Sequence, residues 1–177
     1  MLDDKEVNWF AIRVSYGRVL KFSAQLNEDG IEHFVPMCRK KVERDGKTSV
    51  VSVPAVSNLC FIRASRSFVE EYLRRMGEGR YAHFMWEKST RNPIVVSDKA
   101  MDDFIRVSKI MNDDALYLKD ITEKLREGQR VRVTDGPFKG VEGIVLRIRR
   151  SRRVVIELPG LLAVATNYVD PRFLEIL

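Results

Sequence analysis

The side chains best suited to catalysis or metal binding are few and lie far apart in the chain. The histidines are His33 and His83, and the cysteines are Cys38 and Cys60. Neither histidine has a cysteine or carboxylate at the spacing of a metal site, and the cysteines form no C-x-x-C pair. No acid–base constellation accompanies them. We therefore predict no catalytic residue, no metal site and no cofactor, and we expect both thiols to stay reduced.

Five arginines within seven residues form a dense basic cluster near the C-terminus. They are Arg147, Arg149, Arg150, Arg152 and Arg153. Guanidinium groups bind phosphates, so the cluster predicts a contact with nucleic acid. No aromatic residue interleaves the arginines, and base stacking is therefore not indicated. The alternative interpretation is a solvated turn that keeps a hairpin soluble and its edges unpaired.

The overall composition is that of a globular protein with a basic excess. Its 177 residues are 45% hydrophobic and 32% charged, and the net charge of +6 suits contact with a polyanion. The basic run Arg39–Lys41 is a weaker candidate for such a contact, and a solvated surface explains it better. Arg74-Arg75 is interpreted as a helix surface. No apolar run approaches the roughly 20 residues of a membrane helix. Because Met1–Glu6 is mostly charged, we expect no signal peptide, no membrane contact and a cytoplasmic location.

Two kinds of periodicity alternate in the first 112 residues. Apolar and polar residues alternate over Asn8–Ser15, which predicts a half-buried strand, and the apolar run Leu59–Ile62 predicts a buried central strand. Helical spacing predicts helices that begin near Val19 and near Asp98. These mixed elements predict an α+β fold.

Two local motifs add detail to this region. Asp45-Gly46 is typical of a two-residue hairpin turn. Ser67 followed by Glu70 predicts the capping box of another helix.

The periodicity changes beyond residue 112. Residues 113–127 are charged and weakly patterned, and at most a helical turn or two is expected within Ala115–Leu125. We predict domains at 1–112 and 128–177, joined by a linker at 113–127. After Gly128 the pattern is that of four or five short strands, which predicts a small β-barrel.

The segment Val131–Gly143 resembles the KOW motif. The residues that carry this resemblance are Asp135, Gly136, Pro137, Phe138, Gly140 and Gly143. The first four predict a tight turn after a strand. The last two glycines allow a positive φ or a close backbone approach, so that the next strand begins without crowding.

Together with this motif, the N-terminal half resembles the bacterial NusG family of transcription elongation factors. Trp9–Ile12 looks like the opening strand of the NGN domain, and Pro54–Ile62 lies where the family usually reads P-x-F-P-G-Y-V-F-V. Asn92–Val96 lies where the family has a proline-rich step before its third helix. The resemblance covers almost the whole chain. It implies an NGN-like mixed sheet with flanking helices, followed by a small SH3-like KOW β-barrel.

The resemblance also implies partners. The NGN domain of this family binds the clamp helices of the largest subunit of RNA polymerase. Here the contact is expected at an apolar pocket, with Leu59 and Phe61 as candidates and Val56 at the rim. For Phe61 the alternative is that it simply fills the core. The KOW domain is expected to contact nascent RNA, non-template DNA, a small-subunit ribosomal protein or the termination factor.

Departures from the family pattern narrow the prediction. Val56, Ser57, Asn58 and Leu59 replace the usual aromatic, proline, glycine and tyrosine. The chain is therefore most similar to the specialised antiterminators encoded ahead of surface-polysaccharide operons in Bacteroidetes. We predict a regulator of transcription elongation or antitermination. The alternative is a ribosome- or RNA-binding KOW protein without polymerase function, a class that lacks the NGN-like half.

Overall fold

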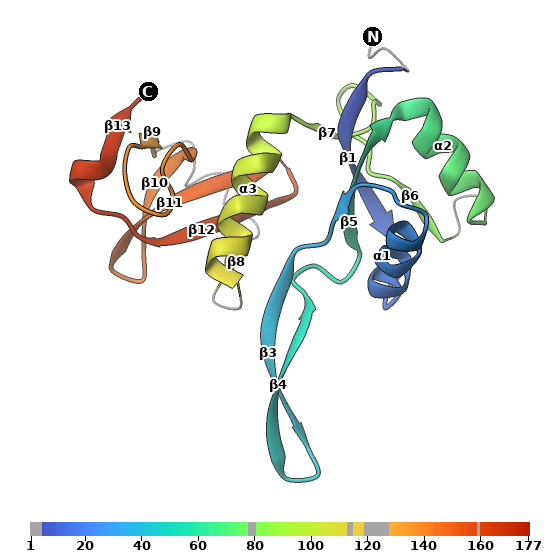
Figure 1. Cartoon of the computed structure of the whole chain (residues 1–177), viewed down its shortest axis with the longest axis horizontal. Helices are drawn as coiled ribbons and strands as arrows, with labels where there is room; N and C mark the ends of the chain where they lie inside the picture. The colour runs from blue at the N-terminus through green and yellow to red at the C-terminus, as the bar shows by residue number, and fades with distance from the viewer. Residues whose placement is uncertain (1–4, 78–80, 113–114, 119–127, 159) are drawn as a thin grey trace. The chain divides into compact units, whose positions relative to one another are not determined.

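The computed structural model describes residues 5–77, 81–112, 115–118, 128–158 and 160–177 (Figure 1). The chain divides into two compact units, residues 1–37 with 54–98, and residues 38–53 with 99–177. The first unit combines helices with a sheet, and the second contains a sheet of six strands. The predicted α+β class is therefore confirmed. No helix within these described ranges is long and apolar enough to cross a membrane.

The sheet of the first unit has the strand order β2-β5-β1-β6, and β7 also pairs with β1. Its strands are β1 (Val7–Val14), β2 (His33–Phe34), β5 (Leu59–Ser65), β6 (Ala82–Phe84) and β7 (Val95–Val96). Every pair is antiparallel. Because β5 lies between two other strands, its first four residues are all buried, as the apolar run predicts.

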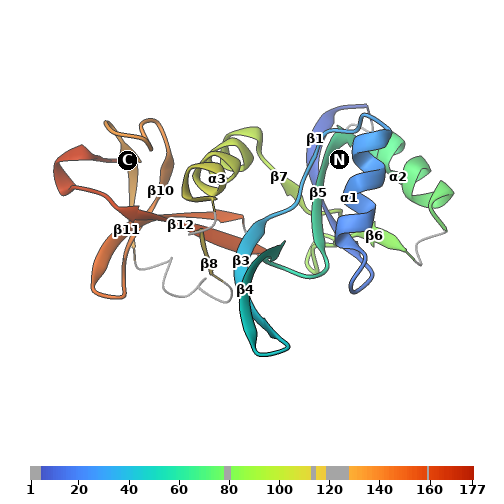
Figure 2. The ribbon, with the colours of Figure 1, turned by 60° about the horizontal axis from the view of Figure 1, so that its bottom comes forward.

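Two helices, α1 (Val19–Glu28) and α2 (Arg66–Arg75), pack against one face of this sheet (Figure 2). The predicted cap of α2 at Ser67 is wrong, because Ser65 is the N-cap and accepts a hydrogen bond from the Phe68 amide at 3.3 Å. Strand β5 runs directly into the helix, so its last, extended residue supplies the cap. Glu70 forms an ion pair with Arg66 at 2.8 Å.

The second unit contains the hairpin of β3 (Met37–Arg44) and β4 (Lys47–Pro54), except for Met37 and Pro54, which belong to the first unit. The two strands form a sheet of their own. Asp45 and Gly46 connect them with φ of 51° and 71°. Positive φ at both central residues is the geometry of a type I′ turn, as predicted from the Asp-Gly pair.

The six-stranded sheet of the second unit has the order β13-β9-β10-β11-β12-β8. Its strands are β8 (Leu116–Leu118), β9 (Gln129–Val133), β10 (Glu142–Ile148), β11 (Ser151–Leu158), β12 (Leu162–Tyr168) and β13 (Leu174–Ile176), with a short 3-10 helix at Pro171–Phe173. All pairs are antiparallel. The all-β character predicted for the C-terminal region is thus confirmed.

The expected linker at 113–127 contains part of this sheet. Leu116–Leu118 form β8, which pairs with β12, so at these three residues the expectation of a helical turn is wrong. The ring of Tyr117 lies 6.0 Å from that of Phe104 on α3 (Asp98–Met111), a helix that belongs to the second unit from Lys99 onward. Strand pairing and this aromatic contact outweigh weak local propensity. Residues 113–114 and 119–127 lie outside the described residues.

Candidate functional site

The KOW motif folds into a compact loop between β9 and β10. The Lys139 amide donates to the Gly136 carbonyl at 3.1 Å, which closes the turn, and the Asp135 carboxylate accepts from the Gly136 amide at 2.8 Å. The Gly140 amide donates to the Val133 carbonyl at 2.7 Å and fastens the base of the loop. Phe138 is buried. The tight turn predicted for this motif is therefore present.

The two later glycines of the motif serve different purposes. Gly140 has a φ of 86°, which a residue with a side chain adopts only with strain. Gly143 lies so close to β11 that an added Cβ would stand 2.4 Å from the Val155 carbonyl oxygen. Positive φ explains the first glycine, and close backbone approach explains the second.

Three polar residues of α3 bind this loop, and the sequence pattern did not lead us to them. Arg106 donates to the carbonyls of Lys139 at 2.7 Å and Pro137 at 3.1 Å, and Lys99 donates to the Gly140 carbonyl at 2.9 Å. The buried Asp103 carboxylate accepts from the Glu142 amide at 3.0 Å and pairs with Lys99. Their spacing of three and four residues, which places them on one helix face, was the available signal.

Two arginines form the turn at the tip of the β10–β11 hairpin. Ile148 pairs with Ser151, which leaves Arg149 and Arg150 as the connecting residues, with φ of 48° and 66°. This is the same two-residue geometry as at Asp45-Gly46, but without a glycine. A left-handed conformation costs an ordinary L-residue roughly 1–2 kcal/mol. The turn is therefore strained, because arginine and not glycine occupies both of its positions.

The neighbouring arginines are placed by the register of the hairpin. Arg147 and Arg152 lie directly opposite each other, and both are exposed. Like charges at directly opposite positions destabilise a sheet. Across the described ranges, no carboxylate pairs with either of them or with the two arginines of the turn. We name Arg147, Arg149, Arg150 and Arg152 the arginine turn.

Arg153 lies apart from the arginine turn. It pairs with Leu146 and therefore points to the opposite face of the hairpin, where it is half-buried. One guanidinium nitrogen donates to the Thr166 carbonyl at 2.9 Å, whereas its Nε is buried without a hydrogen-bond partner. This side chain thus contributes to the sheet, and four of the five predicted arginines come together.

The predicted polymerase contact falls on one face of the first sheet. From β5, Cys60 and Ile62 belong to the core packed against α1 and α2. Because alternate residues point to opposite faces, Leu59 and Phe61 lie on the other side. Phe61 is directly opposite Ala11 of β1. We name this set the apolar face: Trp9, Ala11, Leu59 and Phe61.

Burial distinguishes the three predicted contact residues. Phe61 and Leu59 are 0% and 3% exposed. Val56 is half-buried in the turn before β5, where its carbonyl accepts from the Leu59 amide at 3.4 Å. The burial of Phe61 agrees with the alternative that it packs inside the protein. Its position on the face away from α1 and α2 agrees with the contact surface.

One histidine and one cysteine, His33 and Cys60, have structural roles, whereas His83 is exposed and Cys38 is half-buried. His33 Nδ1 donates to the Ile31 carbonyl at 2.8 Å, which leaves Nε2 to accept from the Ser23 hydroxyl at 2.8 Å. Burial raises the pKa of the Cys60 thiol, which keeps it protonated. The described residues contain no group of three or more His, Cys, Asp or Glu able to hold a metal ion.

The basic strand β9 is neutralised within its own sheet. Arg132 donates to the Glu142 carboxylate at 2.8 Å and also pairs with Glu175 at 3.4 Å. The hydrogen bonds from Arg132 lower the pKa of Glu142 below its usual value and keep this carboxylate ionised. The charge of β9 is thus compensated, in contrast to that of the arginine turn.

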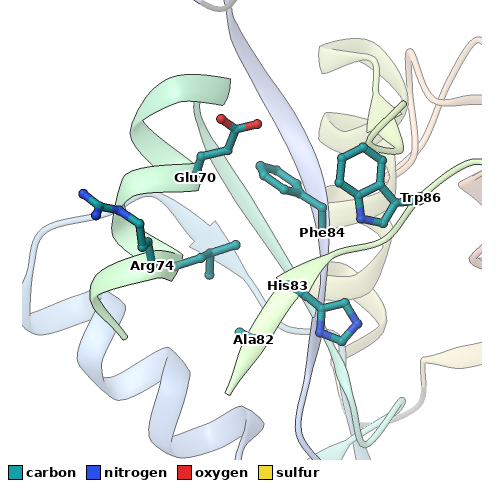
Figure 3. A pocket seen from close by; sticks show the side chains of 7 residues that line it. Glu70, Arg74, Ala82, His83, Phe84 and Trp86 are labelled. Atoms are coloured by element: carbon teal, nitrogen blue, oxygen red, sulfur yellow. The ribbon is translucent and has the colours of Figure 1, made fainter. Parts of the chain in front are cut away.

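A pocket of about 220 Å³ lies between α2 and β6 (Figure 3). Phe84 and Trp86 form its apolar wall, with their rings in an edge-to-face contact at 6.1 Å. Glu70 and Arg74 lie at its border on the helix side. No residue of the predicted polymerase contact, arginine cluster or KOW motif lines it, although His83 does. The pocket has the size and character to accept an apolar side chain.

Two family models match the chain. The sequence model of the family described as "Transcription termination factor nusG" matches residues 7–105, and that of the KOW motif matches residues 127–157. A solved structure entitled "Domain interaction in Thermotoga maritima NusG" covers 98% of this chain and 98% of its own, at 14% identity and a TM-score of 0.48. No curated protein matches the chain. Because the first family model covers more than half of the sequence, the chain belongs to the NusG family of transcription factors, which bind RNA polymerase and are not enzymes.

Proposed function

We propose that the protein regulates transcription elongation or antitermination by binding the polymerase clamp helices through the apolar face. The observation that carries this proposal is the set of apolar side chains on the sheet face opposite α1 and α2. Its border is polar, since Arg63 lies opposite Trp9 and pairs with Asp98 at 3.2 Å. An apolar centre with a charged rim is typical of protein interfaces. Because these side chains are buried here, binding requires that they become accessible.

The departures from the family pattern support a specialised member. The usual aromatic and tyrosine of the segment before and within β5 are replaced here by Val56 and Leu59. Smaller side chains at an interface reduce the contact area and the affinity. Weaker intrinsic affinity suits a factor that is recruited to particular operons, such as those for surface polysaccharides. We place its action in the cytoplasm, where the polymerase works.

The KOW region is proposed to bind nucleic acid through the arginine turn. Two residues with positive φ and a pair of directly opposed arginines both cost stability. A solvated turn needs neither feature, because Asn-Gly would form the same geometry with less strain. Local strain of this kind clusters at functional sites. The matching of the NusG family model to the N-terminal half favours transcription over a purely ribosomal role.

The proposed role as a whole is tested by retention on RNA polymerase and by transcription through a terminator. Purified protein is expected to be retained on immobilised core polymerase and to increase read-through of a terminator in a run-off assay. Retention on ribosomal subunits without retention on polymerase would contradict the proposal and favour the ribosomal alternative.

Changing the arginine turn separates binding from stability. The double variant Arg149→Asn/Arg150→Gly is expected to raise the free energy of unfolding by about 1 kcal/mol, because it relieves two left-handed arginines. The same change is expected to weaken binding of single-stranded RNA. It should also flatten the slope of log K against log salt by about 1.4, at about 0.7 for each phosphate that is no longer neutralised. Urea unfolding and fluorescence anisotropy measure the two effects.

The matched control for this experiment removes the same charge from a helix surface. Arg74→Ala/Arg75→Ala lowers the net charge by the same amount on α2, and RNA affinity is expected to change little. If the turn variant is more stable but binds RNA with the affinity and slope of the wild type, the arginine turn is a solvated hairpin tip.

A further inference from the structure

The β3–β4 hairpin is a ribbon without a core of its own. Its strands pair only with each other among the described residues, and Figure 2 shows them paired as a two-stranded ribbon. Most of its side chains are exposed, including Val50 and Val51. An isolated two-stranded hairpin is marginally stable in water. This ribbon of eight residues per strand buries little surface, so most of its side chains are accessible to a binding partner.

The turn geometry fixes which side chains share a face of this ribbon. A two-residue turn at Asp45-Gly46 pairs Arg44 with Lys47, and the pairing then continues back along both strands. The hydrogen bond from the Ser49 hydroxyl to the Val42 carbonyl, at 3.4 Å, agrees with this register. Alternate residues therefore divide into two faces. One face, the Lys40 face, comprises Cys38, Lys40, Val42, Arg44, Lys47, Ser49, Val51 and Val53.

Charge is distributed unequally between the two faces. The Lys40 face carries Lys40, Arg44 and Lys47 and no carboxylate. The opposite face combines its basic residues with Glu43. All three cations of the Lys40 face are exposed, and none has an ion-pair partner within the described part of the chain. The basic run at Arg39–Lys41 is therefore split between the faces. The Lys40 face carries three cations and no carboxylate, whereas the opposite face carries two cations and one carboxylate.

We propose that the Lys40 face binds double-stranded B-form DNA, with the ribbon lying in the major groove. This groove, roughly 12 Å wide, admits a two-stranded β-ribbon. Lys40 and Arg44 are four residues apart on one face, a span of about 13 Å at roughly 3.3 Å per residue. A ribbon that lies along the groove places such a row of cations beside the phosphates that border it. The proposal does not depend on the polymerase contact or on the arginine turn.

The chemistry of the face favours DNA over other partners. The valines between the cations offer apolar contact for thymine methyl groups, which project into the major groove. Double-stranded RNA has a deep and narrow major groove that side chains cannot enter. The Lys40 face should therefore contribute to DNA binding and contribute little to binding of duplex RNA.

Adjacent lysines on the same strand provide a matched test. Lys40→Glu and Lys41→Glu change the net charge equally, at neighbouring exposed positions, but on opposite faces. For a fluorescein-labelled DNA duplex of mixed sequence, Lys40→Glu is expected to weaken binding about tenfold at low salt and to flatten the salt slope by about one. Lys41→Glu is expected to change affinity less than about twofold, since Lys41 neutralises no phosphate in this arrangement. The arginine turn stays intact in both full-length variants.

The outcomes separate a specific face from general charge. Equal losses for the two variants would show a non-specific charge effect and overturn the proposal, as would unchanged affinity for Lys40→Glu. An equal effect of Lys40→Glu on duplex RNA would overturn insertion into the major groove. Far-UV circular dichroism and gel filtration should match the wild type for both variants, because the hairpin is exposed. Arg44→Glu should reproduce the result of Lys40→Glu.

Discussion

Replacing Phe61 with alanine is expected to abolish retention of the protein on RNA polymerase, whereas the same change at its neighbour Ile62 is not. Phe61 lies on the apolar face, and Ile62 packs with α1 and α2 on the other face of β5. Loss of an aromatic anchor at the centre of an interface costs about 2 kcal/mol or more, or roughly 30-fold in affinity. Binding to immobilised core polymerase measures the difference.

The comparison with Ile62 controls for stability. Both residues are almost fully buried, and each alanine variant is expected to destabilise the fold by about 2–5 kcal/mol. Assays at a temperature where circular dichroism shows both variants folded isolate the contact itself. If retention on polymerase falls equally in both variants, the effect of Phe61→Ala is explained by the loss of a packed core side chain. If the folded Phe61→Ala protein binds like the wild type, the apolar face is not the contact.

Replacing Gly143 with alanine is expected to unfold the KOW sheet at much lower urea concentrations. The added Cβ would stand 2.4 Å from the Val155 carbonyl oxygen and 2.9 Å from a methyl carbon of Val154. Because the nearest atom belongs to the backbone of β11, a rotamer change cannot relieve the contact. The two strands must move apart, at a cost of about 3 kcal/mol.

The positions of the tryptophans allow this effect to be localised. The two tryptophans of the chain, Trp9 and Trp86, both lie in the first compact unit. Far-UV circular dichroism should therefore show an early transition in Gly143→Ala that tryptophan fluorescence does not follow. Gly140→Ala is the control, because it adds strain at a positive φ without a backbone clash and should cost only about 1 kcal/mol. A Gly143→Ala curve equal to that of the wild type would show that the strands adjust freely.

Elements with strong periodicity could be predicted from the sequence. The alternation in β1, the apolar run in β5 and the Asp-Gly turn each encode their structure locally, and each is found where it is expected. The helix cap at Ser65 and the strand at Leu116–Leu118 could not be predicted in this way. The first depends on where β5 ends, and the second depends on pairing with β12, a partner more than forty residues later.

The candidate sites show the same division. The KOW loop was identified because its turn chemistry is local, and four of the five clustered arginines do come together. The prediction grouped Arg153 with the other four arginines, because only the strand register shows that its side chain lies on the opposite face. Likewise, the sequence shows three consecutive basic residues at Arg39–Lys41, but the alternation of the ribbon divides them between two faces.

The central place of β1 has a consequence for how the protein is made. This strand pairs with β5, β6 and β7. It is synthesised before all three, so its pairing is complete only after β7, at Val95–Val96, has left the ribosome. That interval is about 80 residues, or about 4–16 s at a synthesis rate of about 5–20 residues per second. During it, the nascent chain presents the apolar run Trp9–Ile12 without its strand partners. Slow translation or a ribosome stalled before Val96 should therefore favour capture by chaperones and aggregation.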